Sequence, residues 1–296
     1  MNKLFEIFGR RSNWAVPYII FMSIFVVMPL VMVVYFAFQD TAGNFSIYNF
    51  EKFVQQTETL NTFIYSIGIA FITTVLCLLF GYPAAYFMAR TEFGTPKVMA
   101  LLFILPMWIN MLLRTLATVA LFDFIHLPLG EGALVFGMVY NFLPFMIYPI
   151  YNTLQKMDNN LIEAAHDLGA NKTKVFLKVI FPLSKPGIIS GITMVFMPTI
   201  STFAISELLT MNNIKLFGTV IQENINSGIM LNYGAALSLI MLVIIGLTSF
   251  IGDNGNEDDA TVTIHFFHAL ASIRVCISPD DGSFDVLQKG STTKHN

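Results

Sequence analysis

Long apolar segments recur along this chain and restrict its fold more than any other feature. Because a helix rises about 1.5 Å per residue, crossing a bilayer core of about 30 Å requires roughly 20 apolar residues. Six segments meet that requirement, at approximately residues 15–38, 63–89, 98–122, 133–151, 187–208 and 233–252. We therefore expect an all-α, polytopic membrane protein with six transmembrane helices.

The composition agrees with a membrane protein and divides the chain. Of the 296 residues, 55% are hydrophobic and only 12% are charged, against about 25% charged residues in an average soluble protein. Residues 253–296 differ from the rest, with seven acidic residues against three Lys or Arg. We expect three parts: a cytoplasmic N-terminus at residues 1–14, a transmembrane domain at residues 15–252, and an atypical, disordered cytoplasmic tail at residues 253–296.

The distribution of Lys and Arg predicts the orientation of these spans, because cytoplasmic loops carry an excess of both. On one side lie Lys3, Arg10, Arg11, Arg90, Lys97, Lys156, Lys172, Lys174, Lys178 and Lys185. The opposite loops hold only Lys52 and Lys215. We expect both termini in the cytoplasm, together with the lysine-rich connection at residues 155–185.

That connection, which we call the elbow (residues 155–185), has the features of two short helices. Asn160 followed by Glu163 indicates a capping box at the start of the first helix. Gly169 suits the position after its last residue, since glycine adopts the left-handed conformation without steric cost. Asn171 can cap the second helix, and Pro182 is expected to stop it.

The second helix of the elbow is amphipathic. Its apolar side is expected to hold Val175, Phe176, Val179 and Ile180, and its basic side Lys172, Lys174 and Lys178. Such a helix can serve as a docking surface for a partner protein, and the two alanines beside Glu163 leave room for one. It can equally rest on anionic lipid headgroups as an interfacial helix, and the residues alone leave both interpretations open.

The residues of the elbow resemble a known motif, the EAA loop of the permeases of ABC importers. The matching residues are Glu163, Ala164, Ala165, Gly169 and Pro182, with the spacing of the motif intact. The motif ends in Ile-x-Leu-Pro, and this chain has Val179, Ile180, Phe181 and Pro182 there. The resemblance implies a type I importer permease whose elbow is a coupling helix docked on a cytoplasmic ATPase dimer. ATP and Mg would then bind to that partner, and this chain would hold no cofactor.

Two further stretches resemble the spermidine/putrescine permeases, particularly their B-type subunit. These are LPMWINMLLRTLA (residues 105–117) and FPLSKPGIISGITMVFMPTISTFAISELL (residues 181–209). The resemblance implies a bacterial inner-membrane permease for polyamines, with a C-type permease chain and an extracytoplasmic solute-binding protein as partners. Ser201 and Thr202 stand where that group has Gly-Glu, which removes an acidic residue from the expected translocation path.

Five residues are candidates for the substrate pathway. Arg114 and Glu207 lie near the predicted outer ends of their spans and could meet at an outer gate. Trp108, Tyr140 and Asn141 could contact amines through cation–π interactions and hydrogen bonds. Snorkelling of the charged pair, and ordinary packing of the aromatic residues, would explain the same positions.

Other classes of protein fit the sequence less well. We find no Walker A sequence, no Ser/His/Asp arrangement and no metal-ligand spacing, and we expect neither ATP hydrolysis by this chain nor a metal or nucleic-acid partner. Alternatives are an importer permease for another small solute and a stand-alone secondary carrier. A carrier would need ion-coupling charges within the membrane, and this chain is poor in them.

Overall fold

The computed structural model describes residues 16–40, 43–90, 105–228 and 230–253. Within these residues every regular element is a helix, and the sole β-bridge pairs Gln39 with Phe45. The all-α expectation is confirmed. The predicted N-terminal part at residues 1–14, the tail from residue 254 onward and the start of the third predicted span lie outside the described residues.

The chain divides into two compact units. The described part of the first unit contains helix α2 (Val16–Met22) and the π-helical turn η2 (Ser23–Val27). Phe21 and Phe25 lie one turn apart there, with ring centroids 4.7 Å apart, and both side chains are more than half exposed. An apolar helix with such exposed side chains is typical of a lipid-facing segment.

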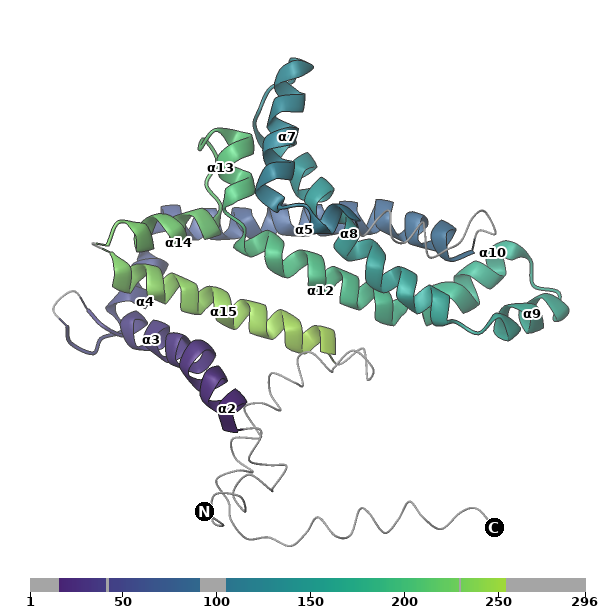
Figure 1. Cartoon of the computed structure of the whole chain (residues 1–296), viewed down its shortest axis with the longest axis horizontal. Coiled ribbons are helices and arrows are strands. Elements are labelled where there is room, and N and C mark those ends of the chain that lie inside the picture. Colours follow the sequence, from purple (N-terminus) through teal and green to yellow (C-terminus); the bar gives the residue numbers. More distant parts are fainter. Residues whose placement is uncertain (1–15, 41–42, 91–104, 229, 254–296) are drawn as a thin grey trace, which may run out of the picture. The chain divides into compact units, whose positions relative to one another are not determined.

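The second unit, Leu30–Glu257, holds the remaining helices. They are α3 (Met28–Ala37), α4 (Tyr48–Gln55), α5 (Thr57–Arg90), α7 (Met111–Phe124), α8 (Glu131–Lys156), α9 (Asn159–Asp167), α10 (Lys172–Val175), η3 (Phe176–Ile180), α11 (Phe181–Leu183), α12 (Lys185–Ser201), α13 (Ala204–Thr210), α14 (Phe217–Asn226) and α15 (Leu231–Asp253). In Figure 1, α8 and α12 both extend from the elbow helices α9 and α10.

Six continuous spans are not what the structure shows. Among the described residues, four helices are long and apolar enough to cross a membrane: Ile20–Ala37, Thr57–Arg90, Glu131–Lys156 and Leu231–Thr248. A fifth arises if Lys172–Leu183 and Lys185–Ser201, which meet at 59°, form one bent span.

Two predicted spans are interrupted by local backbone geometry. The described part of the third contains the 14-residue helix α7, which begins after Asn110 because the Asn110 side chain accepts a hydrogen bond from the Leu112 amide at 2.8 Å. The fifth is broken after Ser201, because Thr202 adopts an extended conformation before α13 begins. Neither break changes hydropathy, so the apolar pattern could not reveal it.

The core is formed where α5, α8 and α12 pack together. Its fully buried side chains include Cys77, Leu134, Met138, Met146, Ile147, Ile150 and Leu154. Gly187 and Gly191 allow α12 to approach α8 closely, since an added Cβ would lie 2.8 Å from the Pro149 carbonyl oxygen and 2.7 Å from the Met146 sulfur, respectively. These two glycines, four residues apart, therefore line a close contact between α12 and α8.

A second apolar cluster joins α15 to α14, α5 and α4. Three aromatic rings meet there, with centroids of Phe53, Phe63 and Phe217 between 4.9 and 6.1 Å apart. The Phe217 amide also donates to Ser66 Oγ of α5 at 2.8 Å. These contacts fix the start of α14 against α5.

Candidate functional site

The elbow begins with a capped helix, although the capping residue is not the predicted one. Asp158, not Asn160, is the N-cap of α9, and its carboxylate accepts a hydrogen bond from the Asn160 amide at 2.9 Å. Aspartate and asparagine are both good N-caps, so the sequence pattern alone does not distinguish Asp158 from Asn160. Glu163 then falls in the middle of α9 and not in its first turn.

Gly169 ends α9 as predicted. Its φ of +77° is left-handed, and the Gly169 amide donates to the His166 carbonyl at 2.8 Å. The Ala170 amide donates to the Ala165 carbonyl at 3.0 Å. These two bonds form a Schellman motif, which satisfies carbonyls that the helix end would otherwise leave free.

The second half of the elbow is capped by Asn171, whose side chain accepts from the Lys174 amide at 2.9 Å. Val175 and Ile180 are buried, and the three predicted lysines are exposed on the other side. Pro182 was expected to stop the second helix, and the helical run Lys172–Leu183 ends one residue after it. The chain then turns at Ser184.

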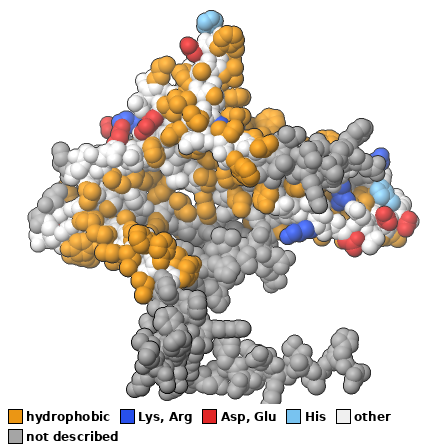
Figure 2. All heavy atoms as spheres, viewed as in Figure 1, with side chains coloured by type: hydrophobic (Ala, Val, Ile, Leu, Met, Phe, Trp, Pro, Cys, Tyr) orange, Lys and Arg blue, Asp and Glu red, His pale blue; other side chains and the backbone are white. Residues whose placement is uncertain are grey.

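The first half of the elbow presents an exposed surface. Glu163 and Ala164 are exposed, and Leu168 is 89% exposed although it is apolar. Ala165 is partly buried against the core, so only one of the two alanines lies open. Figure 2 shows charged and histidine side chains gathered at the α9–α10 end, whereas hydrophobic side chains dominate the middle of that view.

The five predicted pathway residues do not form one cluster. Arg114 is 6% exposed and Asn141 is fully buried, and Asn141 donates to Thr115 Oγ1 at 3.4 Å and to the Gly137 carbonyl at 2.9 Å. Within the described part of the chain, Arg114 Nε and Nη1 and Asn141 Oδ1 have no hydrogen-bond partner. The structure thus places buried polar side chains of α7 and α8 next to each other, where Asn141 contacts Thr115.

Of the other three candidates, Tyr140 interacts electrostatically with Arg114. Glu207 is half-buried on α13, which packs against α7 and α8, but among the described residues no ion pair joins it to Arg114. Tyr140 is 45% exposed and Trp108 is 79% exposed. Their exposure suits a surface that faces lipid or another chain as well as it suits a pathway.

A cavity that the sequence did not predict lies at the break between α12 and α13. Its volume is about 380 Å³, and it is lined by Ser201, Phe203, Gly218, Ile221, Gln222, Ser238, Met241, Leu242 and Ile245. The lining contains no charged side chain. The one sequence signal was Ser201, in the pair that departs from the Gly-Glu of the resembling permeases.

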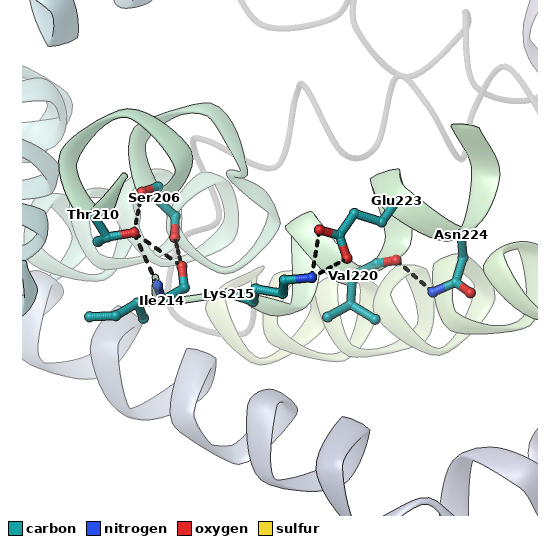
Figure 3. Close-up of polar contacts among 7 residues, drawn as sticks. All are labelled: Ser206, Thr210, Ile214, Lys215, Val220, Glu223 and Asn224. Carbon is teal, nitrogen blue, oxygen red and sulfur yellow. Dashed lines mark hydrogen bonds and ion pairs between the residues drawn. The ribbon is translucent and has the colours of Figure 1, made fainter. Parts of the chain in front are cut away.

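The segment after this break is held by side-chain hydrogen bonds (Figure 3). Ser206 Oγ donates to the Ile214 carbonyl at 2.6 Å, and the Ile214 amide donates to Thr210 Oγ1 at 3.2 Å. Lys215 and Glu223 form an ion pair at 2.7 Å. Lys215, one of the two lysines predicted for the outer loops, is therefore paired with an acidic side chain.

The geometry defines a multi-pass helical membrane protein that exposes a capped, polar elbow between two core helices. The chain belongs to the family of binding-protein-dependent transport system inner membrane components, whose sequence pattern matches residues 5–254. The family identification confirms the class that the elbow motif predicted.

Individual relatives cover most of the chain. It is 31% identical over 246 residues to the spermidine/putrescine transport system permease protein PotB of Escherichia coli K12, covering 76% of this chain and 90% of that protein. It is 31% identical over 256 residues to PotB of Haemophilus influenzae, covering 79% and 89%. A PotB homolog of Mycoplasma genitalium is 28% identical over 217 residues, covering 69% and 76%.

Solved structures share the fold. A chain of a bacterial ABC transporter involved in alginate import matches with a TM-score of 0.62 at 17% identity, covering 86% of this chain and 99% of that one. An inward-facing MetNI methionine ABC transporter chain matches with a TM-score of 0.54 at 15% identity, covering 66% and 93%. The helical arrangement is therefore one found in ABC transporters.

Proposed function

We propose that this chain is the membrane-spanning permease subunit of an ABC importer for polyamines, spermidine or putrescine. The observation that carries the proposal is the 31% identity to PotB of E. coli over 246 residues. Polyamines are flexible aliphatic cations, which aromatic rings attract through cation–π contacts and carboxylates through ion pairs. Trp108, Tyr140 and Glu207 are our candidates for those contacts.

Transport would occur by alternating access driven from outside the chain. The exposed surface of α9 around Glu163, Ala164 and Leu168 would dock on a cytoplasmic ATPase that binds ATP and Mg. Because α9 is capped at both ends, by Asp158 and Gly169, it can transmit a displacement of the ATPase without unwinding. An ATPase dimer offers two docking clefts and this chain has one elbow, so a second permease chain of the C type would complete the assembly. A solute-binding protein would deliver the substrate from outside.

The experiment is purification and reconstitution of the whole transporter. We expect the chain to co-purify with a cytoplasmic ATPase, and proteoliposomes to import radiolabelled spermidine or putrescine only when ATP and the solute-binding protein are present. Glu163→Lys and Gly169→Pro should abolish co-purification, the second because proline requires a φ near −65° and position 169 has +77°. Glu58→Lys, at the exposed start of α5, is the control and should leave co-purification intact.

Two results would contradict the proposal in different ways. If the wild-type chain co-purifies with no ATPase, the chain acts without a docked motor, as a secondary carrier would. If the ATPase docks but neither polyamine is imported, the solute is another one. The Ser201-Thr202 pair, which replaces the Gly-Glu of the resembling permeases, favours this second alternative over the carrier.

A further inference from the structure

The cytoplasmic end of α5 carries three side chains that all contact the elbow. They are Tyr82, Tyr86 and Arg90, spaced four residues apart, and side chains at that spacing lie on one face of a helix. We call these three residues the α5 stripe. Each of them reaches a different part of the elbow.

Arg90, the last residue of α5, contacts the beginning of the elbow. Its Nη1 donates to Asn159 Oδ1 at 2.6 Å, and its Nη2 donates to Met157 Sδ at 3.4 Å. Asn159 is the first residue of α9, directly after the Asp158 cap. The planar guanidinium therefore holds the start of the coupling helix through two separate N–H groups.

Tyr86 and Tyr82 contact the second half of the elbow. The ring of Phe176 lies edge-on to both, with centroids 5.4 Å from Tyr86 and 6.0 Å from Tyr82. Phe176 is the first residue of the π-helical turn η3. Such π-helical turns lie frequently at functional sites, and here the turn is contacted by two aromatic rings of α5.

Tyr82 also holds the bend between α11 and α12. Its Oη lies 3.0 Å from Ser184 Oγ, and Ser184 Oγ donates its own hydrogen to the Phe181 carbonyl at 2.8 Å. Because a serine hydroxyl has a single hydrogen, Tyr82 must be the donor to Ser184. Ser184 is fully buried at the point where the chain turns by 59°.

We propose that the α5 stripe is the transmission surface of the transporter: Arg90, Tyr86 and Tyr82 are positioning residues that fix both halves of the elbow to α5. One contact would act as a pivot about which the elbow could turn. Contacts at Asn159, Phe176 and Ser184 together fix its orientation, so a displacement of the elbow moves α5, which packs along α8 and α12 in the core. This inference rests on the proposed docking of the elbow on an ATPase.

The role can be separated from folding. All three stripe side chains are only half-buried, whereas the core depends on fully buried residues such as Leu134 and Met146. Removing a contact of the stripe should therefore leave the bundle folded and the ATPase docked. What it should change is the number of ATP molecules hydrolysed for each solute imported.

The test uses the whole transporter in proteoliposomes with its solute-binding protein, with ATP hydrolysis and spermidine import measured on the same preparation. For Arg90→Ala and Tyr82→Phe we expect hydrolysis within about two-fold of wild type and import lowered about ten-fold, because side chains along a coupling route change coupling and not binding.

Arg90→Lys, which keeps one N–H donor within reach of Asn159, should restore part of the import. Phe80→Leu, at an exposed ring on α5 outside the elbow, is the control and should behave like wild type.

A double-mutant cycle links the two ends of the Arg90 contact. Asn159→Ala should lose no more coupling than Arg90→Ala, which also removes the contact with Met157, and the double variant should be no worse than Arg90→Ala, since the two changes remove one shared interaction. Hydrolysis and import that fall in equal proportion, or additive losses, would show a merely structural role and overturn the inference. A wild-type elbow that docks on no ATPase would overturn the proposed function, and with it this inference. Normal docking with fully coupled stripe variants would overturn this inference alone.

Discussion

Gly187 sets the distance between α12 and α8 at the level of a single atom. An added Cβ would lie 2.8 Å from the Pro149 carbonyl oxygen and 2.5 Å from Thr153 Oγ1. The hydroxyl can rotate away, but the carbonyl belongs to the backbone of α8. We expect Gly187→Ala to lower the free energy of unfolding by about 1–3 kcal/mol, the usual cost of overpacking, seen as a lower Tm of the detergent-solubilised transporter.

Gly68→Ala is the matched control for that measurement. Position 68 lies within α5 and has no atom within 4 Å of an added Cβ, so the better helix propensity of alanine should stabilise by up to about 1 kcal/mol. Equal melting temperatures for the two variants would contradict the close contact between α12 and α8.

Residues whose role depends on neighbours in sequence were predictable, and those that depend on distant neighbours were not. Gly187 and Gly191 lie four residues apart on one face of a regular helix, a spacing that ordinary packing also produces, and in the structure both line the contact with α8. Gly218 gave no such signal, yet an added Cβ there would lie 2.5 Å from the Ser201 carbonyl oxygen. That contact joins α14 to the end of α12, and only the folded chain brings them together.

At the scale of one element, the N-cap of α9 can be tested against the residue that the sequence favoured. Asp158→Ala removes the acceptor for the Asn160 amide and should cost about 0.5–2 kcal/mol of local helix stability. Hydrogen exchange of residues 159–167 should then become faster while the core helices keep their protection. Asn160→Ala is the comparison, because the Asn160 side chain makes only a 3.4 Å contact with Asp158 Oδ2. If hydrogen exchange were faster in Asn160→Ala than in Asp158→Ala, Asn160 would be the cap.

The elbow shows why elements are predicted better than their boundaries. Gly169 and Asn171 were correct because a left-handed glycine and an Asx cap act within three residues of themselves. Pro182 was one residue from the true end, because the helical run Lys172–Leu183 passes through it before the chain bends. The true turn, at buried Ser184, is stabilised by Tyr82, which is 102 residues away in sequence.

At the scale of the whole molecule, hydropathy located the apolar segments but not their continuity. A window of about 20 residues responds to average composition, and the breaks at Asn110 and Thr202 involve one or two residues each. The family of the chain was predictable because the elbow motif is short, ordered and specific. The cavity beside Ser201 was not, since it is lined by α12, α14 and α15 together.

The arrangement of the core helices makes one prediction about the whole molecule in its membrane. Helix α8 leads into the elbow and α12 leads out of it, and 17 residues of α12 span about 25 Å, so the elbow and the segment after Thr202 must lie near opposite faces of the bilayer. From the lysines of the elbow we expect this end to lie in the cytoplasm. The test uses a chain in which Cys276 is replaced by serine, whereas Cys77 stays in place because it is fully buried. A membrane-impermeant maleimide should then label Asn212→Cys in intact spheroplasts. It should label Lys172→Cys only after permeabilisation. Both positions are exposed, so a difference in labelling reports sidedness and not burial.

The reverse labelling pattern would put the elbow outside the cell, where no ATPase could reach Glu163, and the proposed coupling would be untenable.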